Sequence, residues 1–145
     1  FDHQKQYDLL RLYQRIESFS SAILASAHSG IILARIETKV PIELLKFIQE
    51  MNQHCLTLQQ NFETALVEYQ KNRKNVIHII HKIVDLELYL HQKRTECLEQ
   101  LYLLGNAGKL KVGDFRAIEN LVDAIATTGH SIVEASTSLE WLLMS

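Results

Sequence analysis

The chain has 145 residues, of which 47% are hydrophobic and 22% are charged, and its formal net charge is −2. This length is typical of one domain, and the apolar content is too high for a disordered chain. Five glycines and one proline are too few for the turns of a β-sandwich or barrel. The charge balance lacks the basic surface that nucleic-acid binding requires, and no apolar run approaches the ~18 residues of a membrane span. Composition therefore predicts a soluble, all-α domain with no nucleic-acid partner.

Apolar residues recur at alternating intervals of four and three, which is typical of helices packed in a bundle. The first such seam comprises Leu9, Leu12, Ile16, Phe19, Ile23, Ala27, Ile31 and Ala34. The second comprises Leu44, Ile48, Met51, Cys55, Leu58, Phe62, Ala65 and Tyr69. Another, near the C-terminus, comprises Ile118, Val122, Ile125, Gly129, Ile132, Ser136, Leu139 and Leu143.

These patterns predict four helices in a single domain that covers residues 1–145. Their expected ranges are about 3–38, 41–72, 74–104 and 114–144. Asp114 suits the N-cap of the last helix, and Gly105 suits the end of the third. Short connections favour antiparallel neighbours, so we expect an elongated up-down-up-down antiparallel four-helix bundle with both termini at one end. Because the chain begins at Phe1 and not Met, we expect a processed protein or a domain cut from a longer one.

The third helix has an unusually wide apolar face. Ten of the fifteen residues from Val76 to Leu90 are apolar, and most of them spread over roughly 200° of the helix. Such a helix is either the most buried element or carries a second apolar surface for a partner protein or a second copy of the chain. The candidate partner surface comprises Ile77, Leu86, Leu88 and Tyr89.

The same helix carries Glu87, His91 and Arg94 along its predicted core-facing line. Charged groups there must pair, reach water or bind a ligand, because an unpaired buried charge is strongly unfavourable. One interpretation is a pocket for a small anionic molecule, in which Arg94 binds a carboxylate or phosphate. The other is a salt-bridged network that fixes the register of the helices. The ligand-pocket set, including residues expected to face this line from neighbouring helices, is Glu87, His91, Arg94, Cys55, Gln59 and Gly129.

Motifs for enzyme chemistry are nearly absent. The chain contains no GxGxxG, GxxxxGK[ST], HExxH or GxSxG sequence, so we predict no cofactor, no metal site and no enzyme activity. One short match exists: residues 73–78, Arg-Lys-Asn-Val-Ile-His, resemble the Arg-x4–6-His motif of the all-helical HEPN ribonucleases. The resemblance implies that Arg73 and His78 would act together on an RNA backbone. The same residues also fit a basic loop followed by a solvent-facing histidine.

Two cysteines, Cys55 and Cys97, form no CxxC pair and predict neither a disulfide framework nor a metal site. Two unpaired thiols favour a reducing, cytoplasmic compartment.

The main functional hypothesis is a non-enzymatic interaction module for protein–protein association or self-association, with the third helix as the contact surface. The alternative is a ligand-sensing signalling domain, similar in outline to the extracytoplasmic four-helix domains of bacterial chemoreceptors and sensor kinases. In that case the domain would be extracytoplasmic and would meet a membrane only through flanking segments.

Overall fold

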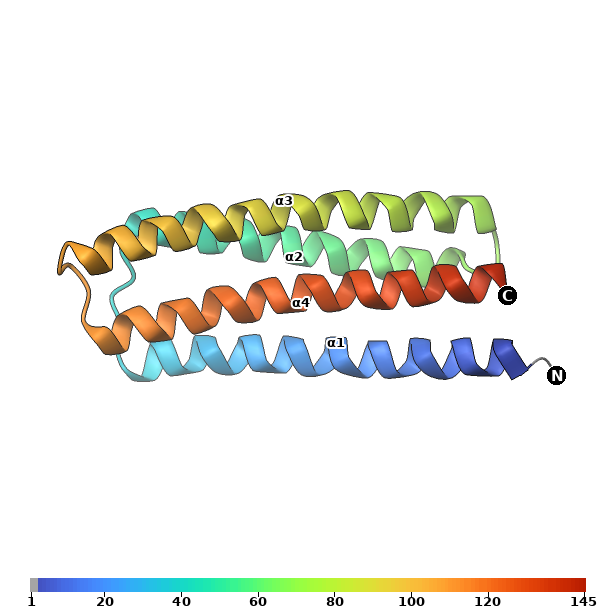
Figure 1. Cartoon of the computed structure of the whole chain (residues 1–145), viewed down its shortest axis with the longest axis horizontal. Helices are drawn as coiled ribbons and strands as arrows, with labels where there is room; N and C mark the ends of the chain where they lie inside the picture. The colour runs from blue at the N-terminus through green and yellow to red at the C-terminus, as the bar shows by residue number, and fades with distance from the viewer. Residues whose placement is uncertain (1–2) are drawn as a thin grey trace.

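The computed structural model describes residues 3–145 and confirms the predicted all-α, up-down-up-down bundle (Figure 1). Its helices are α1 (His3–Arg35), α2 (Ile42–Glu68), α3 (Arg73–Asn106) and α4 (Val112–Met144). No strand occurs within this range. The start of α1 and the end of α4 lie at the same end of the bundle, as expected from four antiparallel rods. Phe1 lies outside the described residues.

The α4 helix is the centre of the fold, because it packs against the other three helices. It has two adjacent buried seams. The predicted seam, which includes Ile118, Val122 and Ile132, belongs to the main core with α2 and α3. A second seam of mostly small residues runs beside it and includes Ala117, Thr128, Ala135, Ser138 and Leu142. Small side chains let two helix backbones approach closely, so this seam allows α1 to pack against α4.

The α1 helix packs on α4 but has no Cα atom within 8 Å of α2 or α3. Figure 1 shows it beneath α4, on the side away from the other two helices. The prediction that consecutive helices pack as neighbours is therefore wrong for α1 and α2. An edge-to-face contact between Phe19 and Phe62, with ring centroids 6.2 Å apart, reaches across the space between these two helices. The bundle is open along its α1–α2 side.

Two polar contacts link α1 and the loop after it to α4. Arg15 forms an ion pair with Glu134, and the Thr38 hydroxyl donates a hydrogen bond of 2.9 Å to Asp114. Asp114 lies in the first turn of α4, whose N-cap is Lys111, so its predicted capping role is wrong.

The end of α3 also differs from its prediction. Gly105 lies inside α3, where an added Cβ would be 3.0 Å from the Phe115 ring, so this glycine leaves room for an aromatic contact. The glycine with positive φ is Gly108, at 69°, and it forms part of the turn after α3. Gly105 is therefore a packing residue and not the predicted helix terminator.

The α1 helix is long and apolar enough, by length and composition alone, to cross a membrane. Only 11% of its most apolar 18-residue window is buried inside the molecule. The expectation that no stretch approaches the length of a span is therefore wrong. Residues 18–34 include several Ser, Ala and Gly, which are less hydrophobic than Leu or Ile, but no Asp, Glu, Lys or Arg.

Candidate functional site

Glu87, His91 and Arg94 line one open cleft of about 670 Å³ between α3 and α4. Both Nε and Nη2 of Arg94 donate to Oδ1 of Asp123, at 3.0 and 2.8 Å. The Arg94 side chain is 31% exposed, so this pair lies at the rim of the bundle and not in its core. Charge-assisted hydrogen bonds of this kind bind a guanidinium well, which supports the network interpretation of Arg94.

Glu87 belongs to a chain of polar side chains that joins three helices. Its side chain is only 17% exposed, and its Oε1 lies 3.9 Å from Nδ1 of His130. Nε2 of His130 lies 2.9 Å from Oε1 of Glu134, and Glu134 pairs with Arg15 of α1. Arg15, Glu134, His130 and Glu87 thus form a continuous polar chain from α1 through α4 to α3. Within residues 3–145, no buried side-chain nitrogen or oxygen lacks a hydrogen-bond partner, so no orphaned polar group calls for a ligand.

The polar α4 residues in and beside this cleft carry a signal in the sequence. Asp123, Thr127, His130 and Glu134 follow a polar 4-3-4 spacing on α4, which places them on one flank of a helix. The apolar spacing of α4 does not reveal these residues.

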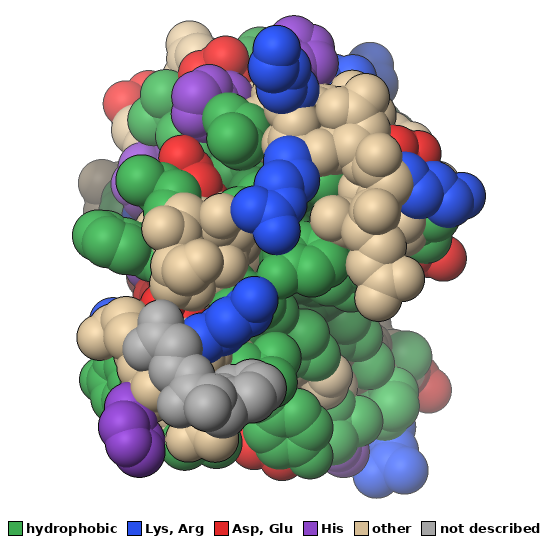
Figure 2. All heavy atoms as spheres, turned by 90° about the vertical axis from the view of Figure 1, so that its right-hand side faces the viewer, with side chains coloured by type: hydrophobic (Ala, Val, Ile, Leu, Met, Phe, Trp, Pro, Cys, Tyr) green, Lys and Arg blue, Asp and Glu red, His purple; other side chains and the backbone are tan. Residues whose placement is uncertain are grey.

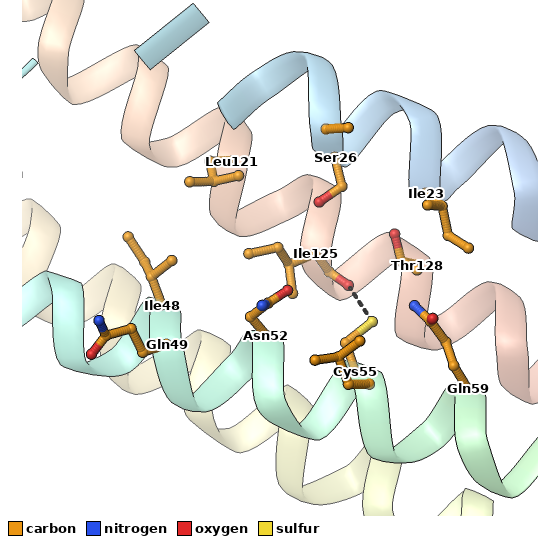
Figure 3. Close-up of a pocket in the computed structure, with 12 residues that line it drawn as sticks. Ile23, Ser26, Ile48, Gln49, Asn52, Cys55, Gln59, Leu121, Ile125 and Thr128 are labelled. Carbon is orange, nitrogen blue, oxygen red and sulfur yellow. Dashed lines mark hydrogen bonds between the residues drawn. The ribbon is translucent and has the colours of Figure 1, made fainter. Parts of the chain in front are cut away.

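Cys55 and Gln59 lie in a different place, a groove of about 460 Å³ on the open α1–α2 side. Figure 3 shows Ile23 and Ser26 of α1 on one side of the groove, Cys55 and Gln59 of α2 on the other, and Thr128 of α4 between them. The Cys55 thiol points to the α4 backbone, 3.9 Å from the carbonyl oxygen of Ile125. This groove does not contain Glu87, His91 or Arg94.

Gly129 is a core residue. An added Cβ would overlap Cδ2 of Leu90 and lie 3.4 Å from Cδ1 of Leu58. The predicted six-residue pocket therefore does not form: three of its members share the polar cleft, two line the groove, and Gly129 accommodates Leu90. The physical reason is the orientation of α3 about its own axis. Its apolar residues face α2 and α4, and its polar residues Glu87, His91 and Arg94 lie along the edge of α4.

Burial makes both thiols poor nucleophiles. Desolvation raises the pKa of Cys55 to about 11, although a hydrogen bond with Gln59 opposes the shift. Desolvation also raises the pKa of Cys97 to about 11. Neither thiol is therefore a candidate catalytic group.

We predict that both thiols react slowly while the protein is folded. At pH 8 the raised pKa leaves about 100-fold less thiolate than an ordinary cysteine has, and burial adds a steric barrier. Labelling with iodoacetamide, followed by mass spectrometry, should modify neither Cys55 nor Cys97 in the native protein and both in urea. Rapid labelling of either residue in the native protein would contradict the prediction.

Arg73 and His78 are both exposed on α3. Arg73 is the first residue of α3. The preceding residue, Asn72, is the N-cap, and its side chain accepts a hydrogen bond from the Asn75 amide. Five positions on a helix differ in direction by about 140°, so the two side chains leave α3 from different sides. The structure does not bring them together, in contrast to what joint action on RNA requires.

The predicted partner surface on α3 is divided by its packing. Ile77 and Leu86 are half-buried against the core. Leu88 is 62% and Tyr89 44% exposed, and the Tyr89 ring contacts that of His54 edge-to-face at 4.5 Å. Exposed apolar surface at these four positions therefore reduces to Leu88 and part of Tyr89.

A larger exposed apolar surface than that of α3 lies on α1, where no partner surface was predicted. The exposed large side chains on α1 and the turn after it are Tyr7, Leu9, Leu10, Tyr13, Ile23, Leu24, Ile31, Ile32 and Ile36. At the end of the bundle that holds the termini, apolar side chains also line a hollow (Figure 2). Leu9 and Leu12 of α1 contribute to a hollow of about 450 Å³ with Leu66 of α2 and Leu139 of α4.

Eight exposed positions on the outward side of α1 form a second seam with the spacing of a packed helix. This outer seam comprises Leu10, Tyr13, Glu17, Ser20, Leu24, Ala27, Ile31 and Ala34. The apolar residues predicted for this helix are thus shared between a side that packs on α4 and a side that is exposed. The signal was available, because α1 has more apolar residues than one seam can use.

No family model, no curated protein and no solved structure matches the chain. No group of three or more His, Cys, Asp or Glu side chains in the described part of the chain is arranged to hold a metal ion. The exposed outer seam of α1 is therefore the feature from which a function is best argued.

Proposed function

We propose that this chain is a non-enzymatic helical module that self-associates through the exposed side of α1. The observation that carries the proposal is the exposure of an apolar helix: Leu10, Leu24 and Ile32 are each more than half exposed. Soluble proteins seldom expose contiguous apolar surface unless it forms an interface.

The total exposed area supports the same conclusion. The chain exposes 9046 Å², about 1400 Å² more than the area of about 7600 Å² that its mass predicts for a compact monomer. A standard protein interface covers about 800 Å² on each partner. Association along α1 alone would therefore use only part of the excess.

The other features of the molecule favour association over catalysis. The two thiols are buried, and Arg94 is occupied by Asp123. Neither the polar cleft nor the groove has an unpaired buried polar group within residues 3–145. The proposal thus keeps the hypothesis of an interaction module and moves its contact surface from α3 to α1.

Sedimentation velocity over a wide range of protein concentration tests this function. We expect a concentration-dependent dimer, and we expect Leu24→Glu to weaken it at least about 100-fold, because a carboxylate would be buried where an apolar side chain stands. Leu103→Glu is a matched control, because Leu24 and Leu103 are each 61% exposed but Leu103 lies on α3.

The control variant should dimerise like the original protein, and both variants should keep the helical circular dichroism of the original. A chain that is monomeric at every concentration would overturn the proposed function. An equal effect of both substitutions would also overturn it, because the contact would then not depend on α1.

A further inference from the structure

We infer that two copies of this chain pair through their α1 helices in antiparallel register, with Glu17 of each copy opposite Arg35 of the other. The inference rests on the proposed self-association and specifies its geometry. It follows from the charge pattern of the outer seam and from the spacing of residues along α1.

Part of α1 is charge-free and is flanked by one charge of each sign. Residues 18–34 contain no Asp, Glu, Lys or Arg, while Glu17 precedes this stretch and Arg35 follows it. The two residues are eighteen positions apart, which is five helical turns at 3.6 residues per turn. They therefore project from the same side of α1, and both are exposed. Neither has an ion-pair partner within residues 3–145.

An antiparallel pair whose centre lies at the level of Ser26 along α1 satisfies both charges twice. In that register a residue a given number of positions before Ser26 faces the residue the same number of positions after Ser26 in the other copy. Glu17 and Arg35 are each nine positions from Ser26, so they face each other at both ends of the contact. A parallel pair in register would instead place Glu17 against Glu17 and Arg35 against Arg35, which is unfavourable. A two-fold axis through the centre also makes the two halves of the interface identical, as in most homodimers.

The same register matches large side chains with small ones. Ile31 faces Ser21 and Ile32 faces Ser20 of the other copy, so a bulky residue meets a small one at these two levels, while Leu24 faces His28. Such pairing lets two helices approach closely and fill the space between them. The apolar seam thus supplies the area of the contact, and the two end charges fix its direction.

A lipid bilayer is the competing occupant for an exposed apolar helix, and α1 fits it less well. By length and composition alone, α1 could cross a bilayer. One side of α1 is already packed on α4, however, and is tied to it by the ion pair of Arg15 with Glu134, so lipid could not surround the helix.

Charge reversal tests the register in the full chain. In sedimentation equilibrium, Glu17→Arg and Arg35→Glu should each weaken the dimer about tenfold, because each turns two attractions into two repulsions. The double variant should recover the original dissociation constant to within about twofold, because the two charges have only exchanged places. Glu63→Arg changes the net charge as Glu17→Arg does, at an exposed position on α2, and should leave the dimer unchanged.

Each other outcome has a distinct meaning. A dimer that weakens with Leu24→Glu but ignores both charge reversals would overturn the antiparallel register and leave the proposed self-association standing. A monomer at all concentrations would overturn both. Co-sedimentation of the original monomeric protein with phosphatidylcholine vesicles, lost in Leu24→Glu, would assign the seam to lipid and likewise overturn both. All these positions are exposed, and unchanged thermal unfolding of the monomers would show that the substitutions act on association.

Discussion

Replacing Leu90 by alanine should lower the free energy of unfolding by about 3–5 kcal/mol. Leu90 is 1% exposed, and its side chain occupies the space that Gly129 leaves on α4. Because Gly129 has no side chain that could move into the vacated space, the cavity should stay largely open. Chemical denaturation followed by circular dichroism would measure the effect.

Leu88→Ala is the matched control for this substitution. Leu88 lies two positions away on the same helix but is 62% exposed, so its loss should change the free energy of unfolding by less than about 0.5 kcal/mol. A loss below about 1 kcal/mol for Leu90→Ala, or equal losses for both variants, would contradict the described packing of α3 on α4.

Adding a side chain at Gly129 should also destabilise the protein, by about 2–3 kcal/mol for Gly129→Val. The first carbon of that side chain would overlap Cδ2 of Leu90 and would approach Leu58 to 3.4 Å. Both leucines are fully buried, so neither can move without disturbing the core. Thermal or urea unfolding would measure the loss.

Gly30→Val tests whether this effect comes from packing and not from the helix itself. Gly30 is also inside a helix, but an added Cβ there would lie more than 4 Å from every heavy atom of the other helices. We expect a change within about 0.5 kcal/mol of zero. The combination of Gly129→Val with Leu90→Ala should lose less stability than the two separate losses added, because each change relieves the other. Strict additivity would show that the two residues do not share one space.

The core residues of α2 and α4 were predictable because they follow the helical period without interruption. Met51, Leu58, Ile118 and Ile132 were all placed in seams, and all are buried. Each predicted helix corresponds to an observed one. Errors at the ends concern Asp114 and Gly105, where side-chain contacts with Thr38 and Phe115 replace the expected capping.

The candidate site was predictable only in part. Glu87, His91 and Arg94 do share one cleft, because residues three and four apart lie on one side of a helix. Their partners Asp123 and His130 come from α4, and periodicity within one helix carries no information about which neighbour it faces. Cys55 and Gln59 were assigned to the same pocket on the assumption that consecutive helices pack as neighbours. Because the bundle is open between α1 and α2, these two residues line the groove on that side.

The amino-acid sequence by itself determined the helices, their antiparallel order and most of the buried seams, because these depend on local periodicity and short connections. The tertiary structure decided which seams are covered. The sequence located an excess of apolar residues on the third helix. The structure shows that two neighbours cover most of the apolar residues of α3, whereas α1 has one neighbour and leaves its outer seam exposed. Burial depends on how many helices surround each one, and that number is a property of the assembled bundle.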